Sequence, residues 1–218
     1  NGYDYDIVET ADGRCWFAEN LKTTTFANGE DLQISYGNSS GGYLSGVYWD
    51  NLRGTDNTIV NSQSGVYVIE SNGAIPTGDN VSMLYNFTAI VDDNGLCPID
   101  WHVPSINEFE TLFDSYGGIN NASLSLKSSA IDECASSVIY NPSGLEVDSR
   151  FYVTWNNSGY DWITSQSILS TSTYYNTNSL IYPNQSKRVV IYNCGVDGSV
   201  DIQTTFLNNG SSVRCIKD

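Results

Sequence analysis

Basic residues are scarce in this chain. Only nine of its 218 residues are Lys or Arg, against 25 Asp or Glu, so the formal net charge at pH 7 is −16. No run of basic residues occurs. An acidic surface repels phosphate backbones and anionic lipid headgroups. The composition therefore argues against nucleic acid and anionic membrane surfaces as partners.

Long apolar runs are also absent. No stretch is long and apolar enough to suggest a membrane span, so we expect no direct membrane insertion by this segment. The sequence begins without Met or a signal peptide, and we expect Asn1 to begin a mature or trimmed chain. Charged residues make up only 16% of the chain, which is rich in Asn, Ser, Thr and Tyr. This composition is typical of a secreted or surface-displayed domain.

The chain also has few histidines and no closely spaced cysteines. His102 is the only histidine, and no two cysteines form a C-x-x-C pair. A zinc site of the common Cys/His type is therefore not expected. Cysteines spread along an exported chain favour disulfides, and an odd number leaves at least one thiol free or paired outside the chain. The five cysteines are Cys15, Cys97, Cys134, Cys194 and Cys215.

The residues that are present predict an α+β domain with many short strands. Apolar residues make up 40% of the chain, which is enough for a sizeable core. Polar–apolar alternation predicts a half-exposed strand near the N-terminus, turned by Asp12-Gly13, and a short helix is expected over residues 83–93. Further strands are predicted at residues 65–70, 187–193, 199–206 and 211–216.

The clearest helix begins at Ser105. Ser105 and Glu108 have the spacing of a capping box, in which each side chain bonds the other residue's backbone N–H. Phe109, Leu112, Phe113 and Tyr116 then recur at helical spacing, and Gly117-Gly118 supplies a stop.

Six short motifs follow one another along the chain in the order of a known family. They are DGRCWFAENLK at 12–22, LYNFTAI at 84–90, LCPIDWHVPSINEFETL at 96–112, LKSS at 126–129, YDWITSQS at 160–167 and NGSSVRCIKD at 209–218. Together they resemble the Fibrobacter succinogenes major paralogous domain family. Asp100 stands where that family usually has Gly, a family segment is reduced at residues 143–151, and residues 182–199 look longer than usual.

The resemblance implies a single domain over residues 1–218 with a C-type-lectin-like fold, related to that of formylglycine-generating enzymes. In that fold both chain ends join one sheet, two short helices flank small antiparallel sheets, and a long loop region forms a face for ligands. The family pattern also supplies a disulfide between Cys97 and Cys215. Such a bond is worth roughly 4–5 kcal/mol in the chain-entropy model. For Cys15 we favour pairing with Cys134 or Cys194.

His102 is the one side chain that a Ser/His/Asp or Cys/His mechanism would have to use. It directly precedes a capped helix and lies among Trp101, Val103 and Pro104. We therefore expect a structural histidine that satisfies a buried backbone group, and no catalytic residues. A hydrolase or oxidase that uses His102 or a cysteine is the less favoured alternative.

Calcium is the one cofactor that the sequence suggests at all. Residues 92–95 and 197–201 gather oxygen ligands in turns, although neither matches an EF-hand loop. A structural Ca²⁺ is therefore a minor alternative to the main expectation, which is no metal and no cofactor.

Residues 155–193 are dense in Tyr, Asn, Ser and Thr, which are side chains that build adaptable recognition surfaces. A plain polar surface is the competing interpretation. The predicted ligand-binding residues are Trp155, Tyr160, Trp162, Tyr174, Tyr175 and Tyr182.

Two function classes follow from this pattern. The first is a non-enzymatic binding or display module, secreted or on a bacterial cell surface, whose partner is a glycan, a protein or another copy of itself. The second is a structural subunit of a pilus or extracellular fibre.

Overall fold

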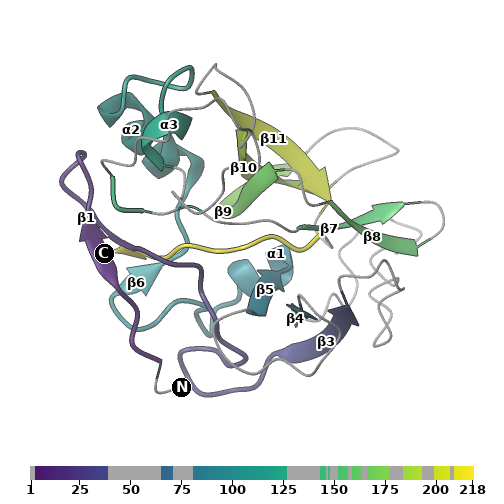
Figure 1. The fold of residues 1–218 in the computed structure, drawn as a ribbon. Helices are drawn as coiled ribbons and strands as arrows, with labels where there is room; N and C mark the ends of the chain where they lie inside the picture. The colour runs from purple at the N-terminus through teal and green to yellow at the C-terminus, as the bar shows by residue number, and fades with distance from the viewer. Residues whose placement is uncertain are drawn as a thin grey trace.

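The computed structural model describes residues 3–38, 65–70, 81–126, 143–145, 147, 152–156, 159–163, 166–176, 184–192, 199–206 and 209–218. The described part is α+β, with short helices and several small sheets (Figure 1). This confirms the prediction of an α+β domain.

Both ends of the chain join one four-stranded sheet, here called the terminal sheet. Its antiparallel strands lie in the order β1 (Ile7–Glu9), β2 (Cys15–Phe17), β12 (Ile216–Lys217) and β6 (Trp101–His102). Strands β1 and β2 are joined by the predicted Asp12-Gly13 turn, where Gly13 has a φ of +78°. The first and last strands therefore close the fold together, as Figure 1 shows at its left side.

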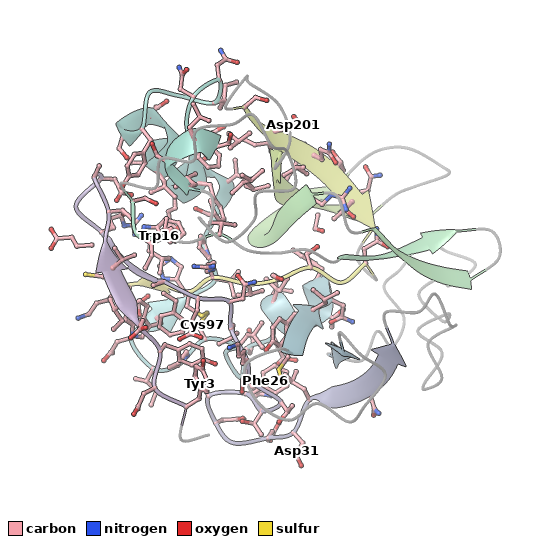
Figure 2. The ribbon with its side chains drawn as sticks, viewed as in Figure 1. Tyr3, Trp16, Phe26, Asp31, Cys97 and Asp201 are labelled. Carbon is pink, nitrogen blue, oxygen red and sulfur yellow. A yellow bond between two sulfur atoms is a disulfide. The ribbon has the colours of Figure 1, made fainter. Side chains whose placement is uncertain are left out.

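The terminal sheet separates two apolar cores because successive strand residues point to opposite faces. Trp16 and Ile216 pack on one side with α2 (Ile106–Ser115) and α3 (Ser123–Leu126). Phe17 and Cys215 pack on the other side with α1 (Phe87–Ile90). Figure 2 shows Trp16 and Cys97 on opposite sides of the last strand. The central strands β2 and β12 are thus fixed from two sides, and their register cannot slip without exposing one of the cores.

The predicted capped helix is present as α2 (Ile106–Ser115). Ser105 Oγ accepts from the Glu108 N–H and Glu108 Oε2 accepts from the Ser105 N–H, so the capping box is complete. Phe109 and Leu112 are buried against the core. A further short helix, α3 (Ser123–Leu126), was not anticipated, so the described residues contain three helices and not the expected two.

The predicted helix over residues 83–93 is wrong in its first part. Residues up to Tyr85 complete strand β5 (Val81–Tyr85), and only α1 (Phe87–Ile90) is helical. Asn86 lies between the two. Its backbone is still extended, and its side chain accepts from the Ala89 N–H at 3.0 Å, so it caps the start of the helix. Sequence periodicity did not reveal this cap.

Strand β5 belongs to a three-stranded sheet with β3 (Gln33–Asn38) and β4 (Gly65–Glu70). The β4–β5 pair is antiparallel, but β3 and β4 run parallel. The expectation of purely antiparallel sheets is therefore corrected here. Parallel neighbours require a long connection, which residues 39–64 provide.

The late strands form two further antiparallel sheets. In the first, β10 (Asn184–Tyr192) lies between β9 (Gln166–Asn176) and β11 (Val200–Phe206). The second is a hairpin of β7 (Tyr152–Asn156) and β8 (Gly159–Ile163). The predictions of strands over 187–193 and 199–206 are confirmed, whereas only the end of 211–216 enters a strand, at Ile216.

Asp100 is held in the left-handed region with a φ of +68°, and it is the only non-glycine with positive φ among the described residues. This conformation strains an L-residue by roughly 1–2 kcal/mol. Gly, which the resembled family pattern has at this position, adopts this conformation without that strain.

Asp100→Gly is expected to raise the free energy of unfolding by about 0.5–1 kcal/mol. The relieved strain exceeds the extra unfolded-state entropy of Gly, which is roughly 0.5–1 kcal/mol. Urea denaturation measures the change, and Asp100→Ala is the matched control that should be less stable than the parent. A glycine variant that is no more stable than the alanine variant would contradict the assigned strain.

Candidate functional site

Polar side chains from separate parts of the chain gather around Glu108, in the first turn of α2. Its Oε1 accepts from Arg14 Nη2 at 2.7 Å and lies 3.0 Å from His102 Nε2. Its Oε2 accepts from the N–H and the hydroxyl of Ser105 at 2.8 and 2.9 Å. Both oxygens are therefore occupied by donors, and the Glu108 side chain is only 17% exposed.

His102 lies between two carboxylates. Its Nδ1 is 2.5 Å from Asp218 Oδ1, on the opposite side of the ring from Glu108. Both contacts are hydrogen bonds at the same time only when each ring nitrogen carries a proton. The prediction that His102 satisfies a buried backbone group is therefore wrong, because its partners are two side chains and 39% of its own side chain is exposed. Asp218, His102, Glu108 and Arg14 are called the polar clasp below.

The polar clasp strongly favours the ionised form of Glu108. Burial alone would raise the pKa of this carboxyl, but the Ser105 N–H, His102, the Ser105 hydroxyl and Arg14 all bond the carboxylate. Together these bonds lower the pKa from 4.5 to about 2. A depressed carboxyl pKa stabilises the fold above the unfolded value, and that contribution is lost as the pH falls through the folded value.

Glu108→Gln should therefore remove a pH-dependent part of the stability. The shift from 4.5 to about 2 corresponds to about 3 kcal/mol in the free energy of unfolding. Above pH 4.5 the parent should be the more stable protein, and the difference should shrink as the pH approaches 2. Urea denaturation of both proteins at several pH values measures this. A difference that stays constant over that range would contradict the assigned role.

The disulfide implied by the family resemblance is present. Cys97 and Cys215 are bonded and both are buried. The bond ties the segment before β6 to the residue before β12. Cys15 is a free, half-buried thiol, so the predicted bond from Cys15 to Cys134 or Cys194 is not formed, and those two cysteines lie outside the described residues.

Arg214 supplies a third tie, next to Cys215. It is 2% exposed, and its Nε donates to Asn20 Oδ1 at 2.7 Å. Its Nη1 donates to the carbonyl oxygens of Phe17 and Leu145 at 3.2 and 2.5 Å. One buried guanidinium therefore joins two separate segments, at residues 17–20 and at Leu145, to the C-terminal segment.

The predicted ligand-binding residues fall on three strands, with one exception. The register of the β7–β8 hairpin pairs Trp155 with Tyr160 and Val153 with Trp162. Directly paired residues and alternate residues share a face, so positions 155, 160 and 162 belong to one face of this hairpin. We call these three positions the hairpin aromatic face.

The two predicted tyrosines of β9 do not share a face. Tyr174 pairs with Ser186 and Tyr175 with Gln185, and successive positions alternate between the faces of a strand. A single surface on this sheet can therefore include only one of them. Tyr182 lies outside the described residues. The role of all six residues in binding stays a prediction.

The two turns considered for calcium differ in what the structure describes. In the first, Asp92 Oδ1 accepts from the Asn94 N–H at 3.1 Å, and Asn94 Nδ2 donates to Glu30 Oε2 at 3.0 Å. Of residues 197–201 only 199–201 are described. No group of three or more His, Cys, Asp or Glu side chains is placed to hold a metal ion within the described ranges.

Sequence reasoning missed the polar clasp as a unit. Glu108 was expected as a cap, but Arg14 and Asp218 lie 94 and 110 residues away from it along the chain. Arg214 was missed as well. No local pattern links such distant residues, and only the closure of the terminal sheet brings them together.

Comparisons with known proteins give one match. A sequence model described as the Fibrobacter succinogenes major domain matches residues 10–217. No curated protein and no solved structure matches this chain. None of the described helices is long and apolar enough to cross a membrane.

Proposed function

We propose that this chain, which belongs to the Fibrobacter succinogenes major domain family, is a non-enzymatic binding or display module at a bacterial cell surface. The closed terminal sheet serves as the scaffold, and the hairpin aromatic face binds the partner. The observation that carries this proposal is the β7–β8 register, which gathers three aromatic positions on one face.

The chemistry of the polar clasp supports a role other than catalysis. A general base needs a free lone pair within reach of a substrate proton. In His102 both nitrogens face carboxylates, at 2.5 and 3.0 Å. Glu108, whose pKa is about 2, likewise has donors on both oxygens. These groups are therefore best suited to holding the last residue against α2.

We also propose that the fold is C-type-lectin-like. Support comes from the pairing of the N-terminal strands β1 and β2 with the C-terminal strand β12 in one sheet, and from the disulfide that locks this closure. The helices α1 and α2 lie on either side of the last strand (Figure 1). A binding surface on late strands and loops, held by a rigid closed scaffold, is a common arrangement for recognition domains.

A glycan array with neutral and acidic members tests the proposal. We expect the protein to retain at least one neutral glycan, because aromatic rings and amide groups suit neutral hydroxyl-rich ligands and the net charge of −16 repels anionic ones. Trp155→Ala with Tyr160→Ala should weaken retention at least tenfold with an unchanged melting temperature.

Thr154 allows a matched control on the same hairpin, because it pairs with Asp161 and not with an aromatic residue. Thr154→Ala lies at the alternate register position, on the other face, and should leave retention unchanged. Retention of no glycan at all, or an equal loss in both variants, would contradict the proposal. Concentration-dependent assembly in sedimentation experiments, together with that result, would favour the alternative of a fibre subunit.

A further inference from the structure

Strand β1 forms an outer edge of the terminal sheet. It pairs only with β2 among the described strands, and Figure 1 shows it at the outer side of the molecule. Edge strands carry backbone groups that another chain can pair with, a mode of binding known as strand addition.

The hydrogen-bond pattern identifies which backbone groups face outward. The Thr10 N–H donates to the Arg14 carbonyl, and the Ala18 N–H donates to the Asp6 carbonyl. Hydrogen-bonded pairs recur every second residue along an antiparallel ladder, so Val8 also bonds inward to Trp16. The N–H and C=O groups of Ile7 and Glu9 therefore point away from β2. Within the described part of the chain, neither of these N–H groups has an acceptor.

The side chains along this edge combine one apolar residue with acids. Ile7 is 56% exposed, although it belongs to an antiparallel ladder. Asp4, Asp6 and Glu9 are exposed as well. The neighbouring cations do not neutralise them, because Arg14 bonds Glu108 and Lys22 bonds Glu19. Two acidic edges would repel each other, so the charge disfavours pairing with a second copy.

We propose that β1 is a docking edge for an extended basic segment of a partner protein. The partner strand continues the terminal sheet beyond β1, with its backbone bonded to Ile7 and Glu9. An apolar residue of the partner lies against Ile7, and the Lys or Arg residues next to it point to the opposite face of the strand, where Asp6 lies. This edge is separate from the hairpin aromatic face, so a test of one proposal does not test the other.

A labelled heptapeptide of alternating Lys and Val is the probe. It should bind the parent protein at low ionic strength by fluorescence anisotropy, and more weakly as salt is added. Ile7→Pro should weaken binding at least tenfold, because proline removes the outward N–H while the inward bonds of Val8 stay in place. The matched control Ile7→Thr keeps that N–H and should lose less affinity than the proline variant.

Amide hydrogen exchange provides a second test that needs no variant. The peptide should slow exchange at Ile7 and Glu9 at least tenfold and leave Val8, which is already bonded inward, nearly unchanged. The proposal is overturned if the peptide does not bind the parent, if the proline and threonine variants bind equally well, or if exchange at Ile7 and Glu9 is unaffected. A dimer of the parent that Ile7→Pro abolishes would also overturn it, because the occupant would then be a second copy.

Discussion

The double substitution Cys97→Ala and Cys215→Ala is expected to lower the free energy of unfolding by about 5 kcal/mol. The two residues are 118 positions apart, so their bond removes the entropy of a loop that spans more than half the chain. Both side chains are buried, and their loss also leaves small cavities. A domain stability of roughly 5–15 kcal/mol would thus fall by a third or more.

Urea denaturation of the parent with and without a reductant measures the same effect if the double variant fails to fold. Cys15→Ala is the control, because Cys15 is a free, half-buried thiol and takes no part in the disulfide. It should change the stability by less than about 1 kcal/mol. Equal effects of the double variant and of the control would show that the disulfide does not brace the fold.

Arg214→Leu is expected to lower the free energy of unfolding by about 3–5 kcal/mol. The substitution keeps most of the side-chain volume but removes every donor. The carbonyl oxygens of Phe17 and Leu145 and the amide oxygen of Asn20 then lose this partner inside the protein. Buried acceptors that lose their donors cost about 1–3 kcal/mol each, and neighbouring costs are only partly additive.

Arg214→Lys separates charge from geometry. Lysine keeps the positive charge but lacks the planar guanidinium that reaches three acceptors at once, so it should still cost about 2 kcal/mol or more. Lys217→Leu, at an exposed position three residues later, is the control and should change the stability by less than about 0.5 kcal/mol. Denaturation midpoints in urea compare the four proteins. A lysine variant as stable as the parent would contradict the role of the three bonds.

Local signals in the sequence predicted local structure well. The Ser105–Glu108 capping box, the Asp12-Gly13 turn and the strands at 187–193 and 199–206 were all predicted from residues close together in the sequence, and each is present. The prediction of a helix over residues 83–93 was wrong before Asn86. Tyr85 is buried in a strand, and Asn86 caps the helix that follows. Tertiary context overrides propensity in such short segments.

The long-range features were of two kinds. The Cys97–Cys215 bond was expected from the family resemblance and is present. The partners of His102 and Arg214 were not predicted, because His102 meets Asp218 and Arg214 meets Phe17 only after the terminal sheet has closed. Pattern and spacing carry no information on contacts over such separations, and these contacts depend on the topology.

The most direct test of this account measures the binding of His102→Ala to a neutral glycan that the parent retains. In the proposed function, the polar clasp is a structural element and the β7–β8 hairpin is the binding element. The folded variant should therefore bind that glycan within twofold of the parent, although its melting temperature is lower. A loss of more than tenfold in a variant that is still folded would show that the lone histidine takes part in function.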